Sequence, residues 1–225
     1  MRLVKVLDKG FVELEDFMGG DLRVVNAAKV SFHKHSIEMG EREEKLIKYL
    51  VKHRHGSVFE HTYFTFRVKA PLFVVREWQR HRIGSYNEMS GRYVEFEPEF
   101  YVPEQFRVPA ENNKQGSVLY DEKTSWHKIM RAHVEATYRI EYEAYKEMLD
   151  RNVAKEMARM VLPLSLYTEF YWTVNARSLS NFCSLRSGVD AQWEIRQYSK
   201  TLEALWETEM PITYEAWIDN GSQAL

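Results

Sequence analysis

The chain has 225 residues, of which 44% are hydrophobic and 28% are charged, so it has the composition of a folded globular protein rather than a disordered one. Its formal net charge of −2 leaves no basic excess, which argues against a protein that coats nucleic acid. The single cysteine, Cys183, excludes an internal disulfide, a four-cysteine zinc site and a dithiol redox pair.

The N-terminal quarter predicts two short strands followed by two helices. Residues 2–7 and 11–15 have strand-like patterns around a glycine turn. The Gly19-Gly20 pair then breaks the chain ahead of Asp21, which we interpret as the N-cap of a helix. A second helix is predicted from Glu41 to about His53, because its apolar residues recur with the helical period.

The period changes in the next segment of the chain. Residues 61–69 alternate apolar and polar side chains, which predicts a half-buried strand. Pro71 is expected to open a helix that reaches about His81, and Gly84 with the polar residues after it ends that helix. Residues 92–102 are predicted to be extended, and residues 109–116 to form an exposed loop.

The remainder of the chain is mainly helical in pattern. A long helix is predicted from about Leu119 to Leu149, and a shorter one over residues 153–160. Residues 164–174 form a strand-like aromatic run, and helices are predicted over residues 175–186 and 191–207.

These elements predict an α+β fold in which a mainly antiparallel sheet packs against several helices, one of them long. No repeat or flexible linker divides the sequence, so we expect one domain of residues 1–225. The N-terminus lacks the apolar core of a signal peptide, and no run approaches the ~18 apolar residues of a membrane span. We therefore expect a cytoplasmic protein that does not associate with membranes.

Several common catalytic motifs are absent from the sequence. It contains neither a G-x-G-x-x-G fingerprint nor a P-loop, and it lacks both a nucleophile elbow and an H-E-x-x-H helix. Any nucleotide must therefore be held by residues outside these motifs.

The densest run of polar residues extends from Arg80 to Arg92. It combines three arginines, a histidine, two serines, an asparagine and a glutamate around Gly84. Guanidinium groups and hydroxyls bind phosphate, and a carboxylate can accept from ribose hydroxyls, so the run is suited to a nucleotide. The competing interpretation is a solvated helix end whose cations complement the helix dipole.

A second set of polar residues lies within residues 175–186. Arg186 continues the apolar face of the predicted helix and needs an anionic partner, either a ligand or a carboxylate such as Glu194. Asn175 and Asn181 have amides that could bind a planar heterocycle; the alternatives are a helix N-cap and an ordinary surface amide.

Two further features have a functional and a structural interpretation. His53, His55 and His61 are spaced closely enough to suggest a metal site, but no cysteine or acidic pair nearby completes a ligand set, so we expect no metal. Cys183 lies on an apolar helical face and is interpreted as a small buried hydrophobic residue rather than a nucleophile.

At these residues the sequence resembles the flavin-dependent thymidylate synthases. The family motif R-H-R-x-x-S-x-N-E-x-S-x-R is matched completely by Arg80, His81, Arg82, Ser85, Asn87, Glu88, Ser90 and Arg92. The resemblance extends over nearly the whole chain and includes D-K-G-F-V-E-L at residues 8–14, F-E-H at 59–61, V-L-P-L at 161–164, W-T-V-N-A-R-S-L at 172–179 and A-Q-W-E-I at 191–195.

This resemblance implies reductive methylation of dUMP to dTMP. The one-carbon donor would be 5,10-methylenetetrahydrofolate, FAD would carry the hydride and NADPH would be the reductant. The partners would be small molecules without nucleic acid, and the assembly a homotetramer whose active sites are shared between subunits.

The resemblance also assigns residues to the site. Arg186 would be catalytic, lying against the polar edge of uracil and favouring its ionised form. The positions that match flavin-contacting residues are His55, Ser57, Arg80, His81, Arg82, Glu88, Asn175, Ala176, Arg177 and Asn181. The positions that match nucleotide-contacting residues are Glu77, Trp78, Gln79, Arg80, Glu88, Met89, Ser90, Gly91, Arg92, Arg159 and Arg186.

Two positions depart from the family pattern. Glu77 stands where relatives often carry glutamine, and its carboxylate would repel a phosphate unless Arg76 or Arg80 neutralises it. Asp190 stands where some relatives have a histidine near the flavin, and it is given no role.

The chemistry of the residues agrees with a flavin mechanism. Uracil C5 is a poor nucleophile, and Cys183 has no charged neighbour in sequence that would lower its pKa and make it reactive. The activating hydride must then come from a cofactor, while a buried arginine stabilises negative charge on the heterocycle.

Three other classes of protein compete with this interpretation. A module for single-stranded RNA would also combine arginines with aromatic residues, but the net charge argues against it. A purely structural oligomer leaves the clustered arginine, asparagine and serine residues without a task. A tRNA-uridine methyltransferase that uses folate and flavin would require a Rossmann glycine motif and a reactive cysteine.

Overall fold

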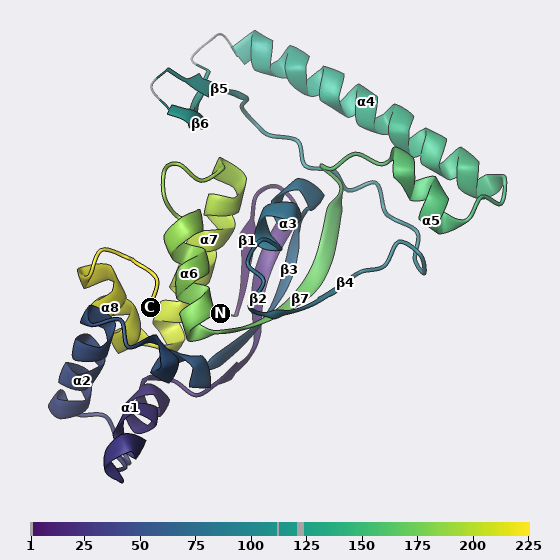
Figure 1. Ribbon diagram of the computed structural model, residues 1–225. Coiled ribbons are helices and arrows are strands. Elements are labelled where there is room, and N and C mark those ends of the chain that lie inside the picture. Colours follow the sequence, from purple (N-terminus) through teal and green to yellow (C-terminus); the bar gives the residue numbers. More distant parts are fainter. Residues whose placement is uncertain (1, 112, 121–123) are drawn as a thin grey trace.

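A five-stranded antiparallel sheet forms the centre of the computed structural model, which describes residues 2–111, 113–120 and 124–225 (Figure 1). The longest pairing joins β3 to β7 over nine residues, from Tyr63 opposite Asn175 to Pro71 opposite Tyr167. Across the sheet the strands are β1 (Leu3–Val6), β2 (Gly10–Met18), β3 (Tyr63–Pro71), β7 (Tyr167–Asn175) and β4 (Ser85–Glu88).

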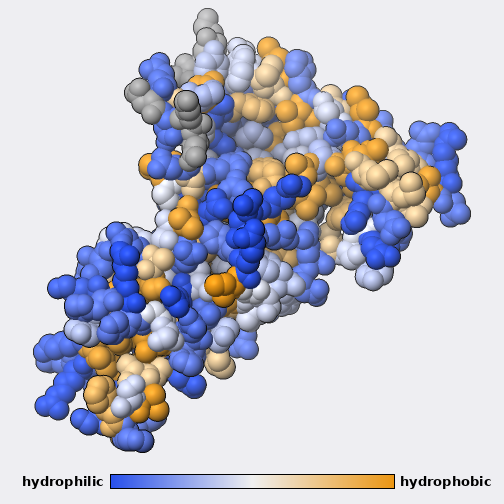
Figure 2. Space-filling view, in the orientation of Figure 1, coloured by the Kyte–Doolittle hydropathy of each residue, from blue (hydrophilic) through white to orange (hydrophobic). Residues whose placement is uncertain are grey.

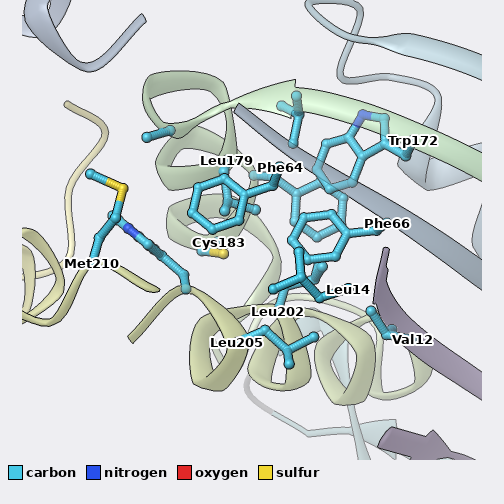
Figure 3. Close-up of a cluster of buried hydrophobic side chains, with 14 of the residues drawn as sticks. Val12, Leu14, Phe64, Phe66, Trp172, Leu179, Cys183, Leu202, Leu205 and Met210 are labelled. Carbon is cyan, nitrogen blue, oxygen red and sulfur yellow. The ribbon is translucent and has the colours of Figure 1, made fainter. Parts of the chain in front are cut away.

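The two faces of the sheet differ in polarity because successive side chains of a strand point to opposite sides. Phe64, Phe66 and Trp172 are fully buried on one face, where helices cover them (Figure 3). On the other face, Arg67 forms ion pairs with Glu13, Glu15 and Glu169 at 2.5 to 2.9 Å. The covering helices are α3 (Leu72–Trp78), α6 (Ala176–Arg186) and α7 (Trp193–Glu209).

Helices from both ends of the chain meet at one end of the molecule (Figure 1). Asp21 begins α1 but does not cap it, because Gly20 occupies the N-cap position. The Asp21 carboxylate instead accepts hydrogen bonds from the backbone N–H groups of Ile212 and Thr213, both at 3.0 Å. The elements here are α1 (Asp21–Lys29), η1 (Val30–Phe32), α2 (Glu41–Lys52), η2 (Gly56–His61) and α8 (Pro211–Asp219).

The opposite end of the molecule contains a smaller core under a long helix. Phe96, Phe100 and Tyr145 are buried in this core, and the Tyr145 hydroxyl accepts from the Phe96 backbone N–H at 3.1 Å. An ion pair between Arg107 and the buried Glu194 links the adjacent hairpin to α7. The elements here are β5 (Arg107–Ala110), β6 (Asn113–Leu119), α4 (Thr124–Asp150), α5 (Lys155–Ala158) and η3 (Arg159–Val161).

The predicted fold class is confirmed, since the structure combines an antiparallel sheet with helices and includes a 27-residue helix, α4. The predicted strands correspond to β1, β2, β3 and β7, and most predicted helices are present with shifted ends. Pro71 ends β3 and is the N-cap residue of α3, so it opens the helix as predicted, although that helix ends at Trp78 rather than near His81. The strand β4 and the helix α8 were not predicted.

Two predicted segments are wrong. Residues 92–102 are irregular, with a turn and a single bridge between Phe100 and Leu166 rather than a regular strand. Most of residues 109–116, together with Leu119, belong to the β5–β6 hairpin, so α4 begins only at Thr124. Asn112, in the predicted loop, lies outside the described residues.

The surface carries apolar side chains at the end formed by α1 and α2 (Figure 2). Val30, Phe32 and Ile37 are 66%, 74% and 90% exposed there. Within the described parts of the chain, no helix has the length and hydrophobicity to cross a membrane.

Candidate active site

A pocket of about 690 Å³ lies between the end of α3 and the helix α6. Trp78 closes α3 inside the aromatic core, which fixes the backbone that follows it. The Tyr86 hydroxyl then donates to the His81 carbonyl at 2.7 Å and holds this loop against the sheet. The residues around the pocket are Glu60, Arg80, His81, Arg82, Ile83, Asn175, Arg177, Ser178, Asn181, Leu185, Arg186, Ala224 and Leu225.

Arg186, at the C-terminal end of α6, is held by three hydrogen bonds. Its Nη1 donates to the Glu77 carboxylate at 2.9 Å and its Nη2 to the Glu77 carbonyl at 3.3 Å. Its Nε donates to His81 Nε2 at 3.1 Å. The sequence suggested Glu194 as a partner and Arg76 or Arg80 as the cation beside Glu77, and both suggestions are wrong. Glu194 is engaged by Arg107 and Tyr101 instead.

The hydrogen bond from Arg186 determines the state of His81. Arginine has no acceptor atom, so His81 Nε2 must accept and the ring proton lies on Nδ1. Burial, with a smaller contribution from the charge of Arg186, lowers the pKa of His81 to about 4. His81 is therefore a neutral hydrogen-bond donor at physiological pH.

The charges around the pocket are predominantly positive. Arg177 forms an ion pair with Glu60 at 2.5 Å, and Glu77 offsets Arg186. Arg80 and Arg82 have no carboxylate partner among the described residues. Two guanidinium groups are thus free to bind an anion at the pocket, which favours a ligand that carries phosphate.

The N-terminal end of α6 forms one side of the pocket. Asn175 is its N-cap, because Oδ1 accepts from the Ser178 N–H at 2.8 Å, as the structural alternative predicted. Its amide nitrogen stays available to a ligand. Asn181 lies one helical turn beyond Ser178 and also lines the pocket. Ala176 is buried, and its N–H donates to the Thr62 carbonyl, so its side chain contributes only packing.

The predicted flavin contacts His55 and Ser57 lie beside this pocket. His55 precedes Gly56 and Ser57 follows it at the start of η2, and both side chains are exposed. A Cβ atom on Gly56 would come within 2.6 Å of Arg177 Nε, so the backbone here packs directly against a pocket residue. In the described part of the chain, no three histidine, cysteine or acidic side chains form a group able to hold a metal ion, and His53, His55 and His61 are not such a group.

The later residues of the polar stretch lie elsewhere. Ser90, Gly91, Arg92 and Arg159, here named the Ser90 group, pack near α5, and Arg92 pairs with Glu156 at 2.9 Å. A Cβ on Gly91 would overlap the Phe96 ring, so only glycine fits there. The strand β4 separates the Ser90 group from Arg80–Arg82 by about 13 Å of extended chain. The predicted residues therefore do not all line one pocket of a single chain.

The predicted nucleotide contacts Gln79, Glu88 and Met89 lie between the pocket and the Ser90 group. Gln79 donates to Glu88 Oε2 at 3.3 Å, and Thr168 of β7 donates to Glu88 Oε1 at 2.8 Å, so the Glu88 carboxylate at the end of β4 is held between the end of α3 and β7. Met89 follows it at the exposed edge. Trp78 is fully buried, so its side chain packs in the core instead of reaching a ligand.

Cys183 confirms the structural interpretation of its position. Its side chain is fully buried on the inner face of α6, near Leu179 and Leu202 (Figure 3). Burial raises the pKa of its thiol well above the ordinary value. The thiol is therefore unreactive and lies away from the pocket lining.

Two contributors to the pocket were not predicted from the sequence. Glu60 lies in the F-E-H segment but was not assigned a contact, although it is the carboxylate that pairs with Arg177. The Tyr86 hydroxyl fixes the His81 backbone, and its place in the middle of the family motif was the available signal.

Comparisons with known proteins identify the family of this chain. Residues 13–212 match the family described as thymidylate synthase complementing protein. The chain is 48% identical over 214 residues to a flavin-dependent thymidylate synthase from Thermosipho africanus, covering 95% of this chain and 93% of the relative. It is 48% identical over 215 residues to one from Thermotoga neapolitana, covering 96% and 94%.

The fold is also similar to a solved structure. The UMP/dUMP methylase PolB from Streptomyces cacaoi, bound with 5-Br dUMP, superimposes with a TM-score of 0.88 at 35% identity, covering 99% of this chain and 100% of PolB. Together with the completely matched arginine-rich motif, these similarities show that the chain belongs to the thymidylate synthase complementing protein family, that of the flavin-dependent thymidylate synthases.

Proposed function

We propose that this protein is a flavin-dependent thymidylate synthase that converts dUMP to dTMP by reductive methylation. In this proposal 5,10-methylenetetrahydrofolate donates the carbon, FAD carries the hydride and NADPH is the reductant. The observation that carries the proposal is the pocket that joins Arg186 to Arg80 and Arg82, two guanidinium groups without a carboxylate partner among the residues that the structure describes. The cytoplasm is the proposed location.

The pocket residues fit a flavin nucleotide. Arg80 and Arg82 supply uncompensated positive charge for its phosphates, and Asn175 and Asn181 supply amides for its heterocyclic edges. The neutral His81 offers the Nδ1–H as a further donor. When bound, FAD would supply the hydride that the pyrimidine needs, since no side-chain thiol is reactive here.

Arg186 suits the proposed catalytic role because its contacts leave part of it free. A guanidinium has five N–H bonds, and Glu77 and His81 take three of them. The remaining two, on Nη1 and Nη2, can meet the polar edge of uracil. A fixed positive charge at that edge stabilises the ring after its N3 proton is lost to solvent.

The Ser90 group supports a site shared between subunits. We propose that Ser90, Gly91, Arg92 and Arg159 bind the nucleotide phosphate, while Arg186 of another copy in a homotetramer meets the uracil ring. Ser90 acts there as a phosphate ligand rather than as a nucleophile, because its hydroxyl accepts from the Arg92 N–H and contacts no basic side chain in the described part of the chain. The exposed Arg159 has no carboxylate partner among the described residues, which leaves it free for an anion.

The function is tested with the purified protein by its visible spectrum and by NADPH oxidation. We expect a flavin spectrum, and NADPH oxidation coupled to dTMP formation when dUMP and 5,10-methylenetetrahydrofolate are both present. Well-folded, colourless protein that cannot take up added FAD would contradict the proposal. Salt-sensitive binding of oligonucleotides without colour would favour the RNA-binding alternative.

The role of Arg186 is tested by Arg186→Ala. We expect the variant to fold and to retain flavin, but to lose turnover by about 100-fold or more, because an aimed charge-stabilising donor is removed. Arg139→Ala, on the exposed part of α4, is the matched control. Unchanged turnover in Arg186→Ala would remove the assigned role.

A further inference from the structure

Glu77 is the carboxylate that directly contacts the proposed catalytic arginine. It accepts from Arg186 twice, through its side chain at 2.9 Å and through its backbone carbonyl at 3.3 Å. Both side chains are only partly exposed, at 29% for Glu77 and 21% for Arg186, so their interaction is only partly screened by water. Neither sequence position by itself predicts this pair, because 109 residues separate the two side chains.

We propose that Glu77 is a positioning residue that sets the pH at which bound uracil ionises, because it orients Arg186 and offsets part of its charge. The proposal rests on the proposed function. It deepens that function by adding a residue that controls the substrate's protonation.

The geometry separates orientation from charge. Glu77 accepts from Arg186 through its carboxylate and its backbone carbonyl, which fixes the plane of the guanidinium group. His81 Nε2 accepts from Nε and fixes the third side of that group. His81 brings no charge, because its Nε2 is the acceptor and its pKa is about 4. Glu77 is therefore the group in contact with Arg186 that offsets its charge.

Other charged groups near the pocket do not replace Glu77. Glu60 is committed to Arg177, and the cations Arg80 and Arg82 lie on the loop after α3. Glu194 acts on Glu77 through space but is itself bound to Arg107 and Tyr101. These groups form a constant background, whereas Glu77 is in contact with the guanidinium.

The direction of the effect follows from electrostatics. A negative charge behind the guanidinium disfavours a second negative charge on uracil in front of it, so Glu77 keeps the apparent pKa of bound uracil higher than Arg186 alone would. At separations of several ångströms in a partly buried site, this effect amounts to about one pH unit. Burial also raises the pKa of Glu77 itself, so the effect fades at low pH, where the carboxyl becomes neutral.

The experiment compares the wild-type holoenzyme with Glu77→Gln and Glu77→Asp. Glutamine keeps the shape and an acceptor oxygen for Arg186 but removes the charge, whereas aspartate keeps the charge on a shorter side chain. Ultraviolet difference spectra of bound dUMP, recorded over a neutral-to-alkaline pH series, report the ionised fraction of uracil directly. The pH profile of dTMP formation is measured in parallel. Glu215→Gln is the control, since it removes one carboxylate from an exposed pair with Lys48.

We expect Glu77→Gln to lower the apparent pKa of bound uracil by about one pH unit. The rising limb of the rate profile should shift in the same direction. Glu77→Asp keeps the negative charge, so its apparent uracil pKa should lie closer to the wild-type value than that of Glu77→Gln, whatever its turnover. Glu215→Gln should match the wild type in both measurements.

The proposal is overturned if Glu77→Gln weakens dUMP binding or turnover while uracil ionises at the wild-type pH, because that result indicates a purely structural role. It is also overturned if ionisation moves to higher pH. If the wild type binds no dUMP, the proposed function fails as well. If the wild type binds and converts dUMP but uracil bound to Glu77→Gln ionises at the wild-type pH, only the role of Glu77 fails.

Discussion

Cys183 illustrates how a single residue can be assigned from its surroundings. Its thiol is fully buried and its pKa is raised by that burial, so it forms no thiolate at neutral pH. We expect Cys183→Ala to retain dTMP formation and to lower the free energy of unfolding by about 1 kcal/mol, because one buried atom is lost from the core. Steady-state assays and urea unfolding check both parts. A folded but inactive variant would restore the thiolate mechanism.

His81 makes the stability of the protein depend on pH. Its pKa is 6.5 in the unfolded chain and about 4 in the folded protein, so between these values the unfolded state binds the proton more readily. Stability is therefore lost as the pH falls through this window, by about 2 kcal/mol between pH 7 and pH 5. His81→Gln should remove this share of the acid sensitivity in urea unfolding at the two pH values.

The control for His81 is His133→Gln, which changes an exposed histidine on α4. We expect it to keep the wild-type loss of stability between the two pH values. An equal acid sensitivity in His81→Gln and in the wild type would contradict the assignment of a buried, neutral imidazole.

Among the elements, α8 depends on a residue almost two hundred positions away. Asp21 receives the Ile212 and Thr213 N–H groups and the Thr213 hydroxyl, so it caps α8 from the start of α1. We expect Asp21→Ala to lower the free energy of unfolding by about 2 kcal/mol, since these donors lose their acceptor. Asp16→Ala, which removes only a local hydrogen bond to Phe17, should cost far less. Urea unfolding followed by tryptophan fluorescence compares the two.

The helices and strands differ in how well the sequence predicts them. The strand β3 and the helices α6 and α7 were found because each repeats its own period over many residues. The strand β4 has only four polar-rich residues and exists because Trp172 and its neighbours in β7 offer an edge. Asp21 looked like a local cap because its true partners become visible only in three dimensions.

In the candidate site, too, the sequence predicts the residues of local motifs but not their long-range partners. The resemblance located the arginine-rich motif at residues 80–92 and, separately, Arg186, which follows the matching segment at residues 172–179. The partner of Arg186 could not be identified in this way, since Glu194 and Glu77 are both plausible carboxylates and only the packing of α3 on α6 selects Glu77.

For the molecule as a whole, we propose that residues 1–225 form one domain. The strand β7, from the second half of the chain, lies between β3 and β4 from the first half, and the larger core extends from Val6 to Leu225. Dividing the chain between α4 and β7 would separate β7 from β3, the strand with which it pairs over the most residues, so the two parts would not fold independently.

Assembly is predicted at the same scale. Val30, Phe32 and Ile37 expose apolar side chains at one end of the molecule, which favours burial against another copy in the proposed homotetramer. We expect light scattering to give the mass of four chains, and Phe32→Ser combined with Ile37→Ser to reduce it. Lys45→Ser, on an exposed face of α2, is the control. A wild type that stays monomeric at micromolar concentration would contradict the prediction.

The aromatic core under the pocket has an optical consequence. Trp78 and Trp172 pack at 5.3 Å from each other, and Phe182 connects Trp78 to the His81 ring. Indole emits in the near-ultraviolet and violet, where isoalloxazine absorbs, so a flavin seated against His81 would quench this pair by resonance energy transfer. The tryptophan emission of the unlabelled protein should therefore decrease as the pocket fills with flavin, and it can be used to measure flavin binding.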